Sequence, residues 1–143
     1  MANPTWGLEE GDRSALIDLI VEFAWRVDHR MAGSIHELVT DDIEMKLASG
    51  TFLGKDAVVS WGTNRDLLDR TTSHLAMNFR FQVVHADKVV AGSTAIIFRH
   101  DGSGTGAPVP WAVTEYDDVF VRVNDEWKFQ SRISRDIFVS PPT

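Results

Sequence analysis

The chain has 143 residues, of which 43% are hydrophobic and 24% charged, as expected for one globular domain covering residues 1–143. It contains no cysteine, which excludes disulfides, thiolate metal sites and a cysteine nucleophile. Its net charge of −7 repels phosphate backbones, so we expect no nucleic-acid partner.

The sequence carries no targeting signal that we can identify. No apolar run approaches the ~20 residues that a membrane span needs, so we expect no membrane association. Residues 1–10 contain acids, glycine and proline instead of the basic region and apolar core of a signal peptide. We therefore expect a cytoplasmic protein.

The first half of the chain is predicted to be helical. Apolar residues recur at helical spacing from about Glu9 to His29, and the width of the stripe predicts a helix covered on more than one side. Ser34 and Glu37 have the spacing of a capping box, which predicts a short second helix ending near Val39. A turn at 40–42 and a third helix from Asp56 to about Asp69 follow.

The second half alternates with the period of β-strands. Residues 43–47 and 51–53 read as a short hairpin, and four longer strands are predicted at 73–83, 88–100, 111–123 and 126–138. The segment 101–110 is the one long loop expected. Helices followed by strands predict an α+β fold, with the helices packed on one face of an antiparallel sheet.

Local motifs strengthen this outline. The helix end from Phe23 to Arg30, the strand from Thr72 to Asn78, and the hairpin segments 115–118 and 127–132 resemble the SnoaL-like family of the nuclear-transport-factor-2-like superfamily. The resemblance covers roughly residues 10–138 and includes hexachlorocyclohexane dehydrochlorinase and, more distantly, scytalone dehydratase and bile-acid 7α-dehydratase. It implies a cone-shaped α+β barrel, in which a curved sheet wraps the N-terminal helices around a pocket.

Asp28 and His74 form the strongest candidate pair. Asp28 ends the first predicted helix, where the helix dipole disfavours a carboxylate by ~0.3–1 kcal/mol, so we expect it to have a donor or cationic partner. The resemblance implies that the partner is His74, whose second ring nitrogen would then act as a base towards carbon. The alternative is an exposed Asp28 at a turn and a His74 that faces solvent.

Arg132 and Tyr116 are the next candidates. Arg132 would stabilise an enolate, a departing hydroxide or a bound carboxylate, unless it forms a surface salt bridge and Arg135 faces the pocket instead. Tyr116, the only tyrosine, either donates its hydroxyl to the substrate or packs in the sheet. Strict alternation places Arg132 and His74 on solvent faces, so a place in the pocket requires β-bulges that turn their strands.

Five apolar side chains are candidates for the substrate-binding wall, with ordinary core packing as the alternative: Phe23, Trp25, Trp61, Met77 and Phe98. Phe23 can neither donate a proton nor hold a chloride ion, which disfavours dehydrochlorination. The remaining histidines lack metal-ligand spacing, so we expect neither a metal nor a cofactor.

These residues predict a cofactor-free lyase or isomerase, and most readily a dehydratase, acting on a small hydrophobic substrate. Two alternatives stay open: a non-catalytic small-molecule-binding protein, and an accessory subunit like the β-subunit of ring-hydroxylating dioxygenases. An outer sheet face carrying valine, isoleucine and phenylalanine, together with the resemblance, predicts a homodimer or homotrimer.

Overall fold

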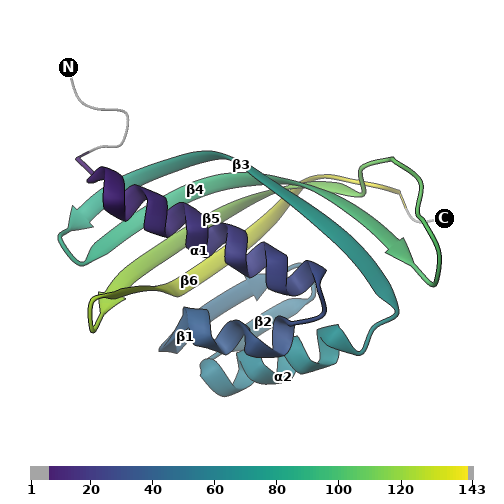
Figure 1. The fold of residues 1–143 in the computed structure, drawn as a ribbon, viewed down its shortest axis with the longest axis horizontal. Coiled ribbons are helices and arrows are strands. Elements are labelled where there is room, and N and C mark those ends of the chain that lie inside the picture. Colours follow the sequence, from purple (N-terminus) through teal and green to yellow (C-terminus); the bar gives the residue numbers. More distant parts are fainter. Residues whose placement is uncertain (1–6, 142–143) are drawn as a thin grey trace.

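The computed structural model describes residues 7–141, so most of the segment behind the cytoplasmic prediction lies outside the described residues. The predicted α+β class is confirmed: helix α1 (Glu10–Asp28) lies across one face of a curved, open six-stranded sheet (Figure 1). The 3₁₀ helix η1 (Ala32–Leu38) and helix α2 (Lys55–Asp66) pack on each other beside the end of α1. Neither α-helix between residues 7 and 141 is long and apolar enough to cross a membrane.

The sheet is mixed, where the sequence predicted only antiparallel pairing. Its strands are β1 (Val39–Leu47), β2 (Gly50–Leu53), β3 (Arg70–His85), β4 (Lys88–Asp101), β5 (Ala112–Val123) and β6 (Glu126–Val139). Their order is β2-β1-β6-β5-β4-β3, and β1 pairs with β6 in parallel while every other pair is antiparallel. A hairpin requires antiparallel strands, but β1 and β6 are far apart in the chain and no hairpin constrains their direction.

The predicted capping box is wrong. The hydroxyl of Ser34 donates to the carbonyl of Met31, and the carboxylate of Glu37 pairs with Arg26, so neither side chain caps the backbone as expected. The segment 40–42, expected to be a turn, belongs to β1. Helix α2 ends at Asp66, earlier than predicted, and there the carboxylate accepts the backbone N–H groups of residues 32 and 33.

Helix α1 is buried along one stripe only, which corrects the expectation of cover on several sides. Its buried residues are Leu16, Ile20, Phe23 and Val27. Trp25 points to the opposite side, is 54% exposed and stacks on the ring of His29. The core therefore lies between this single stripe and the sheet, where Phe81, Phe120 and Phe129 are fully buried.

A β-bulge in β3 reverses which residues face the helix. Met77 pairs with Thr94 and Arg80 with Gly92, so three steps along β3 oppose two along β4, and Asn78 adopts a φ of 55°. Upstream of the bulge the even-numbered residues face inwards, as His74 does, while downstream of it the buried Phe81 has odd parity. Asparagine tolerates this left-handed conformation better than most residues.

Strand β6 contains the corresponding irregularity. Val119 pairs with Ser131 and Phe120 with Phe129, so one step along β5 opposes two along β6. Phe129 and Arg132 consequently both face inwards and are buried, although strict alternation would separate them. The bulges that a pocket role for His74 and Arg132 required are therefore present in both strands.

The opposite face of the sheet exposes apolar side chains. Leu75 is 47% exposed and Ile133 is 41% exposed, and each neighbours an inward-facing site candidate in sequence. Association with another copy would remove such side chains from water. The homodimer or homotrimer stays a prediction.

Gly62 provides a test of the packing between α2 and η1. A Cβ atom at this position would lie 2.0 Å from the carbonyl oxygen of Ala32, a backbone atom that cannot move aside cheaply. We expect Gly62→Ala to lower the free energy of unfolding by at least ~2 kcal/mol, as overpacked sites do. Urea denaturation of the variant beside the wild type measures this loss.

Gly11→Ala is the matched control, because a Cβ atom there meets nothing within 4 Å and alanine favours a helix. Its stability should equal or slightly exceed that of the wild type. Equal midpoints for Gly62→Ala and the wild type would contradict the close approach of the two helices.

Candidate functional site

Asp28 and His74 meet, as predicted, at the end of α1. The Nδ1 atom of His74 lies 2.6 Å from Oδ1 of Asp28, and the backbone N–H of His74 donates to Oδ2 at 2.9 Å. The hydroxyl of Thr72 donates to Oδ1 at 2.8 Å. The carboxylate thus accepts three hydrogen bonds, which compensate for its unfavourable place at the helix C-terminus.

This arrangement fixes the tautomer of the histidine. An ionised carboxylate only accepts hydrogen bonds, so Nδ1 carries a proton and Nε2 of the neutral ring holds a lone pair. Nε2 has no hydrogen-bond partner among residues 7–141, and the side chains of His74 and Asp28 are 17% and 11% exposed. The geometry is that of a histidine base oriented by an acid.

His74 stands between two cavities. The inner cavity has a volume of about 30 Å³, enough to hold water, and is lined by α1 and the sheet as far as Arg132. The outer cavity has a volume of about 430 Å³, which suits a small ligand. Val27, His74 and Tyr116 line both, so a ligand in the outer cavity can reach the free nitrogen of His74.

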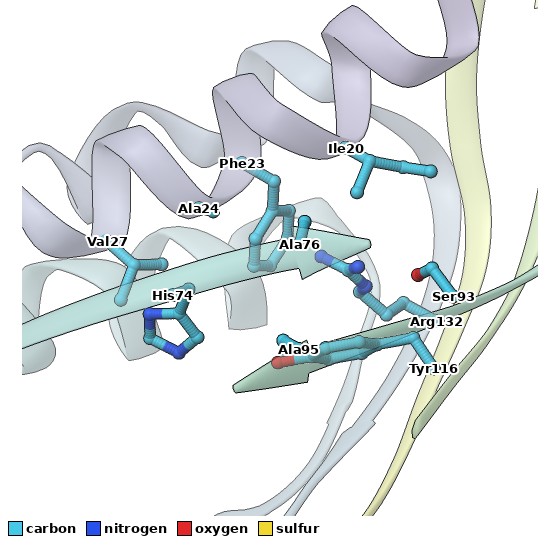
Figure 2. Close-up of a pocket in the computed structure, with 10 residues that line it drawn as sticks. All are labelled: Ile20, Phe23, Ala24, Val27, His74, Ala76, Ser93, Ala95, Tyr116 and Arg132. Carbon is cyan, nitrogen blue, oxygen red and sulfur yellow. The ribbon is translucent and has the colours of Figure 1, made fainter. Parts of the chain in front are cut away.

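Arg132 faces the inner cavity but is not a free cation. Its Nε and Nη2 atoms donate to the carboxylate of Asp118 at 3.0 and 3.4 Å, and the two side chains are 3% and 0% exposed. Figure 2 shows the guanidinium between the rings of Phe23 and Tyr116, whose centroids lie 4.5 and 3.9 Å away. The salt bridge, which the sequence offered only as the alternative and only at the surface, is thus present but buried, and Nη1 has no acceptor among residues 7–141.

Tyr116 is placed to donate a hydrogen bond towards the ligand. Its hydroxyl end points towards His74 in Figure 2, while its ring stacks on Arg132. Burial raises the pKa of Tyr116 above its ordinary value, although the charge of Arg132 opposes the shift. The hydroxyl therefore stays protonated at neutral pH and offers a proton donor beside a basic histidine.

The apolar candidates divide into two groups. Phe23 lines the inner cavity and Trp61 the outer one, and their rings stack at 6.2 Å. Trp25, Met77 and Phe98 line neither cavity, which corrects their predicted place in the wall. Trp25 lies on the exposed side of α1, and the other two have the opposite strand parity to their inward-facing neighbours His74 and Ile97.

Arg135, the second choice for the pocket, lies outside both cavities and pairs with Glu115 at the surface.

Two polar residues were not identified from the sequence. Thr72 holds Asp28 and lies two residues before His74, so the period of the strand was a signal for it. Asp118 holds Arg132 and lies two residues after Tyr116, so the period of β5 was a signal for it, although its acidic character does not distinguish it from the exposed Asp117.

Comparison with known proteins places this site in a family. The SnoaL-like domain matches residues 10–133, so the chain belongs to the SnoaL-like family, as the sequence predicted. Among residues 7–141, no three histidine, aspartate or glutamate side chains gather in a way that could hold a metal ion. No curated protein matches the chain significantly in sequence.

Solved structures share the fold at low identity. A type 2 hexachlorocyclohexane dehydrochlorinase is 23% identical, with 93% of this chain and 90% of that chain covered and a TM-score of 0.80. A candidate scytalone dehydratase from Novosphingobium aromaticivorans DSM 12444 is 19% identical, with coverages of 91% and 87% and a TM-score of 0.79. An NTF2-like protein with a cystatin-like fold from Novosphingobium aromaticivorans is 22% identical, with coverages of 91% and 84% and a TM-score of 0.74.

The buried pair of Arg132 and Asp118 generates a stability prediction. Arg132→Met leaves a buried carboxylate without its partner, which we expect to lower the free energy of unfolding by ~3–5 kcal/mol. Replacing both partners, as Arg132→Met with Asp118→Leu, removes both charges and should recover most of that loss. Thermal unfolding of the two variants and the wild type checks both expectations.

The loss in Arg132→Met should depend on pH. Burial raises the pKa of Asp118 to about 6 even beside Arg132, and removal of the arginine raises it further. A carboxyl whose pKa is raised by folding stabilises the fold below its unfolded pKa and loses that contribution as pH rises through the folded pKa. The deficit should therefore be larger at pH 8 than at pH 5, and an equal deficit at both would contradict a buried, unpaired carboxylate.

Proposed function

We propose that the protein is a cofactor-independent lyase that removes a proton from carbon of a small substrate and eliminates water. The observation that carries the proposal is the unpartnered Nε2 of His74, held by Asp28 at the junction of two cavities. Membership of the SnoaL-like family and the fold shared with a dehydrochlorinase are consistent with lyase chemistry. A positioned base of this kind contributes about 10²–10⁴-fold to a rate.

The steps balance without any further reactant. Nε2 of His74 takes a proton from a carbon beside a carbonyl, and the C–H electron pair leaves an enolate. The enolate then re-forms the carbonyl, its electron pair forms a carbon–carbon double bond, and the bond from the neighbouring carbon to its hydroxyl breaks. The departing hydroxide takes up the proton that Nε2 of His74 now holds, so water leaves and the ring of His74 returns to its neutral form. Asp28 stabilises the imidazolium in the interval, as the acid of an acid–histidine pair does.

In this proposal, Tyr116 and Arg132 stabilise the negative charge that develops on the substrate oxygen. The tyrosine hydroxyl is protonated and points towards His74, so it can donate to a carbonyl or to the departing oxygen. Arg132 retains one amino group without an acceptor, but Asp118 neutralises its charge. We therefore propose that Tyr116 contributes most of the stabilisation of the developing negative charge, and that Arg132 mainly positions the ring of Tyr116.

A non-catalytic binding protein is the second candidate, because a neutralised Arg132 beside an apolar cavity also suits passive binding. The two candidates differ in one measurable property. A lyase of this type exchanges the acidic C–H of a bound ligand with solvent, whereas a binding protein does not.

Deuterium exchange tests the base with a panel of simple carbon acids. Small ketones and β-hydroxy ketones, neutral and carboxylated, are incubated in D₂O with the protein, and loss of their C–H signals is followed by NMR. We expect exchange with the wild type and at least a tenfold slower rate with His74→Gln or Asp28→Asn, which is ~1.4 kcal/mol of transition-state stabilisation. Melting temperatures of the variants establish that they are folded.

Binding of a panel member without any exchange by the wild type would favour the binding protein over the lyase. Wild-type exchange rates in a folded His74→Gln variant would show that His74 is not the base. Either result contradicts the proposed mechanism.

Thr72 is proposed as a positioning residue, because its hydroxyl donates to Oδ1 of Asp28 and makes no hydrogen bond to the ring of His74. We expect Thr72→Val to reduce the exchange rate about tenfold, the effect of one hydrogen bond to a charged group. Thr72→Ser keeps the hydroxyl and should restore the rate. Thr71→Val, on the exposed side of the same strand, is the matched control and should leave the rate unchanged.

A further inference from the structure

The outer cavity gathers positive charge in a chain whose net charge is −7. Arg65, Arg70 and Arg99 line it, and Asp136 is its one acidic wall residue among the described part of the chain. A cavity lined by one sign of charge raises the local concentration of ligands of the opposite sign. The charge of this cavity therefore bears on which ligands enter it.

The acids within reach leave this positive charge incompletely compensated. Arg70 and Arg99 both donate to the single carboxylate of Asp101. Asp136 accepts a hydrogen bond from the hydroxyl of Thr114 and none from a guanidinium. Two cations thus share one acid, and the third cation, Arg65, has no carboxylate within salt-bridge distance among residues 7–141.

Arg65 is the least satisfied of the three arginines. Its Nη2 atom donates to the hydroxyl of Thr72 at 3.0 Å, while Nη1 is buried and has no hydrogen-bond partner among the described residues. Burial and the nearby charge of Arg70 lower the pKa of Arg65 below its ordinary value, although the charges of Asp28 and Asp66 oppose the shift. A buried donor without an acceptor is costly, and an anion beside it would remove that cost.

The strand register fixes the backbone position of Arg99 relative to His74. Thr72 pairs with Arg99 and His74 with Ile97, so the backbone of Arg99 lies one pair of residues along the sheet from that of His74, and its guanidinium reaches Asp101. Two residues along a strand span about 6.6 Å. Arg65 reaches the same level, because it bonds to Thr72, and the wall beside these residues includes Phe52 and Trp61.

We propose that the outer cavity binds an organic carboxylate, with the carboxylate group between Arg65 and Arg99 and an apolar body against Phe52 and Trp61. This inference rests on the proposed function only in taking the ligand to be the substrate of His74. A guanidinium gives charge-assisted hydrogen bonds to a carboxylate, and Arg65 and Arg99 line the same cavity from different elements, with Nε and Nη2 of Arg99 already bonded to Asp101. Arg70 adds charge at the mouth.

The carboxylate serves as a binding group and does not activate the C–H bond. A proton directly beside an ionised carboxylate is very weakly acidic, because its removal creates a second negative charge on the same group. The carbon that His74 attacks must therefore lie further along the molecule, next to a carbonyl within reach of Tyr116. The backbone pairs Thr72–Arg99 and His74–Ile97 lie about 6.6 Å apart along the sheet, which leaves room for such a substrate between the arginine and the histidine.

Ligand binding tests the proposal directly. A panel of aromatic and alicyclic keto acids, each beside its methyl ester, is titrated into the wild-type protein, and the fluorescence of Trp61 and Trp111 in the cavity wall reports binding. We expect at least one acid to bind tenfold or more tightly than its ester. Arg65→Gln and Arg99→Gln should each weaken that acid at least tenfold and change the ester little.

Arg135→Gln is the matched control, since Arg135 lies at the surface outside the cavity, and it should bind acid and ester like the wild type. His74→Gln separates the two proposals: it should keep the preference for the acid while deuterium exchange is lost. If no acid binds better than its ester, or if the preference survives in both folded cavity variants, the carboxylate site is wrong whatever the exchange experiment shows.

Discussion

One extra residue in each of two strands controls the composition of the cavity. Because side chains alternate along a strand, a bulge exchanges the two faces for all residues beyond it. The bulge at Asn78 lets β3 supply His74 to the cavity and Phe81 to the core. The bulge near Ser131 does the same for Arg132 and Phe129 in β6. Without them, a strand that buries its aromatic residues would turn its polar site residue towards solvent.

The bulges also divide the inner surface of the sheet into two zones. Beyond them, Phe81, Phe120 and Phe129 meet Leu16 and Ile20 of α1 in a fully buried apolar core. Before them, polar residues line the space at the other end of the helix, where Asp28 meets β3. The core thus holds α1 at the position from which its last residue reaches the base, and stability and site geometry depend on the same helix.

The sequence was sufficient for the class of fold on physical grounds, whereas the central pair also needed the family resemblance, which pointed to His74 as the partner of Asp28. Long runs of period two predict strands, and a carboxylate at a helix C-terminus requires a partner, so Asp28 is conspicuous even without its neighbour. Pocket walls were harder. Trp25, Met77 and Phe98 are apolar, but which face of an element they occupy depends on one residue of phase. The hydrophobicity of a residue does not indicate which face of the strand or helix it occupies.

Asp118, the partner of Arg132, shows that residue type alone also fails to predict the burial of a polar side chain. Asp117 and Asp118 are adjacent and chemically identical, yet one is exposed and the other fully buried against a guanidinium. The burial follows from parity in β5 and from the bulge in β6, neither of which is a property of an acidic residue.

Charged side chains are compensated to different degrees in the inner and outer cavities, and this difference would orient a bound ligand. At the inner end, Asp118 and Arg132 neutralise each other, so little net charge remains near the place where the reaction would create one. At the outer end, two arginines share Asp101 and a third, among the described residues, has no acid partner. An anionic ligand therefore gains most by placing its charge near the mouth and its neutral, reacting part inside. In this orientation the apolar body packs against Phe52 and Trp61, and the bound ligand excludes water from the space beside His74, which strengthens the interaction of His74 with Asp28. Under the proposed function, this difference in charge between the inner and the outer cavity determines which end of a substrate faces His74.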